Sequence, residues 1–143
     1  MTISFTVFGE PVAQGRPRTA VIGGHARVYD PEKSRNYKTL VKLVAQEAKP
    51  RDLLEGPVIL TLRIYRQIPK SFSKTARAKA HAGELRPTTK PDVSNVLKSI
   101  EDALNGVVWV DDRQIVGLVV SKAYDDNPRV EVEIREIKEA KAG

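Results

Sequence analysis

The chain has 143 residues, a net formal charge of +6 and no cysteine. Disulfides, thiolate zinc sites and cysteine nucleophiles are therefore excluded, and the length fits a single domain spanning residues 1–143. No apolar run approaches the roughly 18 residues of a membrane span, and the first residues lack the features of a signal peptide, so we expect a cytoplasmic protein without membrane contact.

The first third of the chain predicts strands and a loop. Residues 2–7 alternate polar and apolar side chains, which predicts a half-buried strand. Residues 11–24 are rich in glycine and proline, so we expect a loop or turn that carries Arg16 and Arg18. A short strand is expected to follow at residues 26–29.

A helix and a second strand come next. Asp30 and Pro31 have the residue types of a helix cap and a first helical residue, and apolar residues then recur at helical spacing until Pro50 ends the element. Residues 58–66 are predicted to form a strand, because they are rich in β-branched and aliphatic side chains between prolines.

Residues 69–91 differ in composition from the rest of the chain. They are basic, poor in large apolar residues and bounded by prolines, and Ser73 is placed to cap a short helix that ends near Ala82. We interpret the segment as a basic, mobile excursion of the domain, because too few residues follow it to form a second domain.

The last third predicts a helix and three strands. Apolar residues at helical spacing predict an amphipathic helix over residues 94–105 that Gly106 ends. Residues 107–110 are short enough for a buried strand, and residues 115–123 and 129–137 read as two strands paired with each other. The fold class predicted is α+β, a small mixed sheet flanked by helices.

Charge is divided unevenly along the chain. Residues 1–90 carry 17 Lys and Arg against 7 Asp and Glu, whereas residues 91–143 carry 7 against 11. A basic body beside an acidic cluster suits a protein that cleaves phosphodiesters, because cations attract the polyanion and carboxylates hold a metal. A solvated basic surface would give the same composition.

The acidic residues surround the predicted helix 94–105. Asp92 precedes it, Asp102 lies within it, and Asp111 and Asp112 follow the short apolar run. Carboxylates gathered in this way suit a hard cation such as Mg2+. Taken singly, these residues also have ordinary interpretations: a helix cap, a surface acid, and a turn.

Residues 90–115 resemble the signature of the RusA-type Holliday junction resolvases. The family pattern K-P-D-x-D-N-L-x-K, D-A-L-N-G and D-D-x-Q-I is similar to KPDVSNVLK, DALNG and DDRQI in this chain. The similarity extends to GEPVAQGRPR, VYDPEKSRNYK and IPKSFSKTAR, so it covers most of the chain.

The resemblance implies a homodimeric endonuclease that cuts four-way DNA junctions symmetrically, in recombination and repair, with Mg2+ or with Mn2+ as a substitute. Mapped by motif, Asp92 and Asp112 take the roles of catalytic metal ligands and Lys98 that of the catalytic lysine, with Asp111 orienting or supplementing the second ligand. Lys98 is also placed for an ordinary ion pair with Asp102, one helical turn away.

Ser94 is a departure from this pattern, because the family usually has an aspartate there. A serine hydroxyl can coordinate a cation, but it lacks the charge of a carboxylate. Three alternatives follow: Glu101 or Asp111 compensates, the site binds metal more weakly, or the protein binds junctions without cutting them.

DNA contacts are expected from the first loop and from the basic excursion, through phosphates rather than bases. Nucleotide hydrolysis is not implied, because no glycine-rich phosphate-binding motif is present. The two histidines lack metal-ligand spacing, and Trp109 is expected in the core. The residues expected to contact DNA are Arg16, Arg18, Lys70, Lys74, Arg77 and Lys79.

Overall fold

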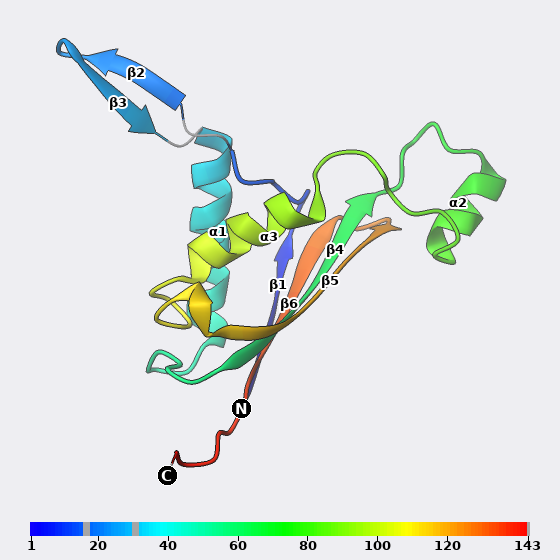
Figure 1. The fold of residues 1–143 in the computed structure, drawn as a ribbon. Helices are drawn as coiled ribbons and strands as arrows, with labels where there is room; N and C mark the ends of the chain where they lie inside the picture. Colours follow the sequence, from blue (N-terminus) through cyan, green and yellow to red (C-terminus); the bar gives the residue numbers. More distant parts are fainter. Residues whose placement is uncertain (16–17, 30–31, 143) are drawn as a thin grey trace.

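The computed structural model describes residues 1–15, 18–29 and 32–142, and this part of the chain contains a four-stranded mixed sheet (Figure 1). The sheet has the spatial order β1 (Thr2–Phe8), β6 (Arg129–Glu136), β4 (Val58–Gln67) and β5 (Ile115–Asp125). The helices are α1 (Glu32–Ala48), α2 (Lys74–His81) and α3 (Val93–Leu104), and the short 3-10 helix η1 (Asp112–Gln114) directly precedes β5. The expected α+β fold is confirmed.

The pairing of the strands differs from the expectation in one respect. β4 runs parallel to β5 and antiparallel to β6, and β6 pairs antiparallel with β1. Both strands expected between residues 115 and 137 are present, but the prediction that they pair with each other is wrong, because β4 lies between them. The segment from β4 to β5 contains α2 and α3, as a parallel pair requires a long crossover.

β6 and β5 differ in burial. Alternate residues of β6 are buried, namely Val130, Val132 and Ile134, because one face of this strand lies against the core. β5, at the edge of the sheet, leaves Val116 and Val119 63% and 57% exposed. Both segments look alike as local apolar patterns, and the difference arises from tertiary packing.

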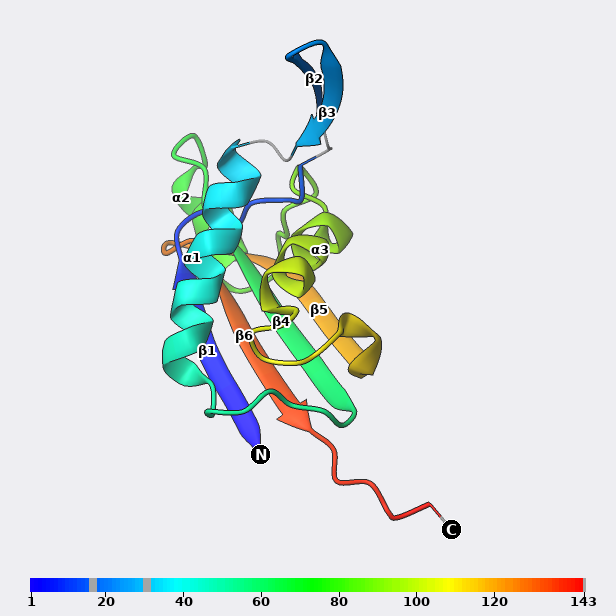
Figure 2. The same cartoon turned by 90° about the vertical axis from the view of Figure 1, so that its left-hand side faces the viewer.

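The hydrophobic core lies between the sheet and the two helices α1 and α3, which cover the same face (Figure 2). α3 presents Val96, Ile100 and Leu104 to this core, at the helical spacing expected from the sequence. Trp109 is fully buried, which confirms its predicted place in the core. The packed face of α3 fixes the direction in which its polar residues point.

A hairpin of β2 (Arg18–Ile22) and β3 (His25–Tyr29) projects from the body of the protein (Figures 1 and 2). The strand expected near residues 26–29 is confirmed, but the loop expected at residues 11–24 is partly wrong, because β2 occupies its second half. Gly23 and Gly24 have φ of 60° and 81°, the left-handed values that a tight two-residue hairpin turn requires. The cap predicted at residues 30 and 31 lies outside the described residues.

The segment after α3 forms a turn rather than the strand predicted for residues 107–110. The amides of Val107 and Val108 both donate to the carbonyl of Leu104, and the amide of Gly106 donates to the carbonyl of Trp109. Gly106 has a φ of 75°, which reverses the chain directly after the helix. The prediction of a strand is wrong because these amides are used in a local turn.

The basic excursion, residues 69–91, contains the short helix that was predicted. Ser73 is its N-cap, and its side-chain oxygen accepts a hydrogen bond of 3.1 Å from the amide of Ala76. The mobility expected of this excursion stays a prediction. Among the described residues, no helix has both the length and the apolar character needed to cross a bilayer.

Candidate active site

Asp92 stands at the N-cap position of α3, but its side chain makes no capping hydrogen bond. Its carbonyl accepts the amide of Val96, as in any first helical turn. The residue is exposed, so its carboxylate faces solvent at the start of the helix. Capping alone therefore does not account for an aspartate at this position.

The chain leading into α3 is anchored to the edge strand β5. Lys122 Nζ donates to the carbonyls of Thr89, at 2.8 Å, and Pro91, at 3.0 Å. Arg86 in turn donates to the carbonyl of Lys122, at 3.2 Å. Lys122 therefore fixes where Asp92 lies, a role that sequence reasoning missed; its only signal was a lysine within an otherwise apolar strand.

A cleft of about 630 Å³ lies beside Asp92. The loop after β1 closes one side of it, because the amide of Gln14 donates to the carbonyl of Asn95 at 3.0 Å. The cleft combines a carboxylate with a lysine ammonium, a lining that suits a charged rather than an apolar ligand. Its lining residues are Ala13, Gln14, Lys90, Pro91, Asp92 and Asn95.

Lys98 lies on the exposed side of α3 and forms the ion pair predicted for it. Its Nζ is 3.4 Å from Asp102 Oδ1, and Lys38 of α1 lies 3.6 Å from the other oxygen of the same carboxylate. The charge and hydrogen bond of Asp102 raise the pKa of Lys98, with smaller contributions from Asp112 and Glu101. Lys98 is therefore a protonated ammonium group whose charge is attracted by the acids near the end of the helix.

Asp111 has a structural role at the start of η1. Its side chain accepts a hydrogen bond of 2.9 Å from the amide of Arg113, and a capping box with Gln114 completes the turn. The bond from Arg113 is the main reason that the pKa of Asp111 is lowered. The ordinary interpretation of Asp111 as a turn residue is thus confirmed, and a supplementary role toward a metal stays a prediction.

Gln114 ties this turn to a distant part of the chain. Its Oε1 accepts the amides of Val110 and Asp111, both at 2.9 Å. Its Nε2 donates to the carbonyls of Leu54, at 2.9 Å, and Gly56, at 3.0 Å. One side chain thereby fixes the backbone that carries Asp112, although sequence reasoning assigned no role to the glutamine of the D-D-x-Q-I motif.

Asp112 lies beside the C-terminal end of α3. Asn105 Nδ2 donates to Asp112 Oδ2 at 3.5 Å. Burial raises the pKa of Glu101, and the negative charge of Asp112 raises it further, whereas the positive charge of Lys98 lowers it. The charges of Glu101, Asp112 and Lys98 therefore act on one another around α3. Glu101 is one of the two acids, with Asp111, that could compensate for Ser94.

α3 separates this acid cluster, Glu101 and Asp112, from Asp92. The nine residues from Asp92 to Glu101 correspond to about 13 Å along a helix axis, and Figure 1 places the start of β5 beside the C-terminal end of α3. Ser94, exposed in the first turn, belongs to the Asp92 end. A single ion shared by Asp92 and Asp112 stays a prediction.

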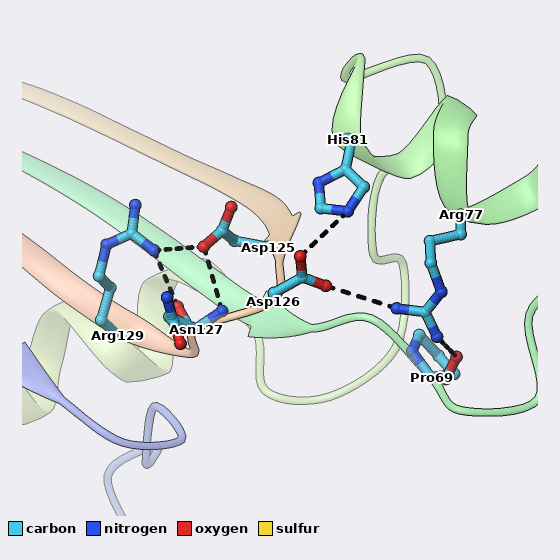
Figure 3. A network of polar contacts seen from close by, with 7 residues as sticks. All are labelled: Pro69, Arg77, His81, Asp125, Asp126, Asn127 and Arg129. Carbon is cyan, nitrogen blue, oxygen red and sulfur yellow. Dashed lines mark hydrogen bonds and ion pairs between the residues drawn. The ribbon is translucent and has the colours of Figure 1, made fainter.

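The residues predicted to contact DNA differ in their structural environment. Lys70, Lys74 and Lys79 are exposed on the basic excursion. Arg77 instead lies 3.4 Å from Asp126 Oδ1, in the turn between β5 and β6 (Figure 3). Arg16 and the side chain of Arg18 lie outside the described part of the chain.

His81 shares the partner of Arg77. Its Nε2 is 3.2 Å from Asp126 Oδ2, and Arg77 also donates to the carbonyl of Pro69 (Figure 3). In the same turn, Arg129 donates to Asp125 at 2.7 Å. α2, within the basic excursion, is thus attached to the turn between β5 and β6 through the exposed carboxylate of Asp126.

Comparisons with known proteins identify the family of this chain. The sequence model described as Endodeoxyribonuclease RusA matches residues 9–135. The uncharacterised protein YqaN of Bacillus subtilis (strain 168) is 51% identical over 137 residues, covering 94% of this chain and 96% of YqaN. A protein of Lactococcus phage r1t named crossover junction endodeoxyribonuclease rusA is 27% identical over 128 residues, covering 89% of this chain and 91% of the phage protein. Because the family match extends over most of the sequence, the chain belongs to the RusA endodeoxyribonuclease family.

Proposed function

We propose that the protein is a Mg2+-dependent endonuclease that resolves four-way DNA junctions. The observation that carries this proposal is the position of Asp112, whose Oδ2 lies 3.5 Å from Asn105 directly after α3, the helix that carries Lys98 and Glu101. Family membership and the name of the phage relative support the choice of junction DNA as substrate. The basic residues of the excursion would supply the attraction for phosphates.

The acid cluster has the donor chemistry of a Mg2+ site. Its oxygen ligands are hard and anionic, and the neutral amide of Asn105 adds no competing charge. No group of three or more His, Asp or Glu side chains able to hold a metal is found among the described residues. Mg2+ is commonly bound by one or two carboxylates with water and substrate phosphate oxygens, so two acids suffice for this ion, and Mn2+ is expected to substitute.

In the proposed reaction, a bound Mg2+ would lower the pKa of a water and stabilise the leaving 3′ oxygen, so that a 5′ phosphate remains. Asp112 and Glu101 would hold the ion at the scissile phosphate. Lys98 would neutralise charge that develops on the phosphoryl oxygens, where a preorganised cation is most effective. Asp102 keeps that ammonium in place through its ion pair.

Asp92 would act from the other end of α3. Its uncapped, exposed carboxylate and the adjoining Lys90 line a cleft that a charged ligand can enter. We propose that Asp92 also serves as a metal ligand, as the family motif implies. Asp92 would bind either the same ion as Asp112 or a separate one, and metal counting by calorimetry with the Asp92→Asn variant distinguishes the two.

We propose that the protein acts as a homodimer. Two nicks placed symmetrically across a two-fold junction need two active sites related by a matching two-fold axis. Light scattering coupled to gel filtration tests this directly. A monomer at the concentrations that give paired nicks contradicts the dimer.

Cleavage of a synthetic mobile four-way junction tests the proposed function. Wild-type protein should produce paired nicks that depend on Mg2+, and Asp112→Asn should abolish them because one of the two ligands loses its charge. Linear duplex of the same sequence is the control substrate. Absence of nicks at every Mg2+ concentration, or unchanged cutting by Asp112→Asn, contradicts the assignment.

A second candidate function is junction binding without cleavage. Ser94 favours it, because this exposed position in the first turn of α3 carries no charge where the family usually has an acid. In that case the protein should bind junctions tightly in a gel-shift assay without nicking them, and Ser94→Asp should restore cutting. Efficient nicking by the wild type excludes this candidate.

A further inference from the structure

The end of α3 carries a small network that connects the core to the acid cluster. Asn105 follows the helix directly, and its amide donates to the carbonyl of Glu101. Gly106 then reverses the chain, so that Trp109 returns beneath Asn105, and the two residues form an isolated bridge. The buried Trp109 and the partly buried Asn105 are thereby held next to each other.

Trp109 fixes the orientation of the Asn105 side chain. The indole Nε1, in a fully buried residue, lies 2.6 Å from Asn105 Oδ1. An indole N–H can only donate a hydrogen bond, so the amide must present its oxygen to Trp109 and its NH2 group in the opposite direction. The reversed orientation would place two donors against each other in a site that water does not reach.

The fixed NH2 group points to the carboxylate of Asp112. The distance from Asn105 Nδ2 to Asp112 Oδ2 is 3.5 Å. This neutral donor engages Oδ2 of the carboxylate without neutralising its charge. Gln114 fixes the backbone of the same turn by separate hydrogen bonds, so Asn105 acts on the side chain alone.

We propose that Asn105, held in one orientation by Trp109, is a positioning residue for Asp112. This inference rests on the proposed function, in which Asp112 is a metal ligand. Partners that orient a metal ligand typically change metal affinity by about 10–100-fold when they are removed. A residue that only ends the helix would change folding stability but not the affinity of the folded protein for the ion.

Mn2+ binding measured by calorimetry on the full chain tests the proposal. Asn105→Ala should bind Mn2+ about 10–100-fold more weakly than the wild type. Trp109→Phe keeps an aromatic ring in the core but lacks the N–H donor, so it should give a smaller loss in the same direction. Asn36→Ala, at an exposed asparagine of α1, is the matched control and should bind as the wild type does.

Cleavage kinetics give a second readout. Saturating Mn2+ should restore most of the kcat of Asn105→Ala, with the KM for junction DNA unchanged, because the ligand is mispositioned but still present. Circular dichroism establishes that each variant is folded. A folded Asn105→Ala that binds Mn2+ as tightly as the wild type overturns the positioning role.

The Asp112→Asn variant separates this inference from the proposed function. If Asp112→Asn loses Mn2+ binding whereas Asn105→Ala and Trp109→Phe retain it, only the positioning role is wrong. If Asp112→Asn binds Mn2+ as the wild type does, the proposed metal site is wrong, and the positioning role is overturned with it.

Discussion

Replacement of Gln114 by alanine should destabilise the protein by about 2–3 kcal/mol. The side chain makes four hydrogen bonds, two accepted from the amides of Val110 and Asp111 and two donated to the carbonyls of Leu54 and Gly56. Each is worth about 1 kcal/mol net, but Val110 is exposed and water replaces part of the loss. For a domain of this size the melting temperature should fall by about 6–12 °C.

A matched variant, Gln114→Glu, separates the two halves of this interaction. It keeps the oxygen that accepts the two amides, but it places a second, anionic oxygen against the carbonyls of Leu54 and Gly56. We expect its melting temperature at pH 7 to fall at least as far as that of Gln114→Ala, and to recover below about pH 5, where a protonated carboxyl group regains one donor.

Thermal denaturation followed by circular dichroism measures both variants, with Gln46→Ala as the control at an exposed glutamine of α1. A fall of less than about 2 °C for Gln114→Ala refutes the reasoning, because the four hydrogen bonds that join two separate backbone segments would then contribute little to stability.

The remaining predictions concern charge. Burial and the charge of Asp112 raise the pKa of Glu101. The metal-free protein should therefore lose stability relative to Glu101→Gln as the pH rises from the ordinary glutamate pKa near 4.3 through the raised value. Melting temperatures of both proteins in EDTA measure this, and a difference between them that stays constant with pH contradicts the prediction. Lys98→Met should lower kcat by about 100-fold with little change in junction affinity, because the lysine charge acts in the transition state. Single-turnover cleavage measures the rate and gel shifts measure the affinity. A loss of affinity as large as the loss of rate would indicate a binding role instead. Asp126→Asn should free Arg77 from its ion pair so that it can contact a DNA phosphate. The slope of log K for DNA binding against log salt concentration should then steepen by about 1, which filter binding at several salt concentrations measures. An unchanged slope means that Arg77 does not reach DNA.

Local patterns predicted most of the elements. The alternation in β1 and β6 and the helical spacing in α1 and α3 are visible in the sequence because each depends on which face of a single element is buried. The apolar run at residues 107–110 was misread as a strand, since a short apolar run has no distinctive period and the turn at Gly106 decided its conformation. The position of β4 between β5 and β6 depends on packing between distant segments, which no local pattern records.

The candidate site was predicted in part. The motif identified Lys98 and Asp112; the structure places Lys98 in the middle of α3 and Asp112 beside the C-terminal end of that helix. The role of Glu101 followed only as an alternative, because nothing in the sequence indicates that residue 101 meets residue 112. Gln114 and Lys122 hold the site through backbone carbonyls far away in the chain, and such contacts become visible only when the fold is known.

The central claim is that Glu101 and Asp112 together hold a divalent cation. Crystals soaked in Mn2+ and measured at an anomalous wavelength test it most directly. The claim predicts an anomalous peak within about 2.0–2.6 Å of a carboxylate oxygen of both residues. Strong Mn2+ peaks elsewhere in the crystal, with none beside Asp112, would contradict it.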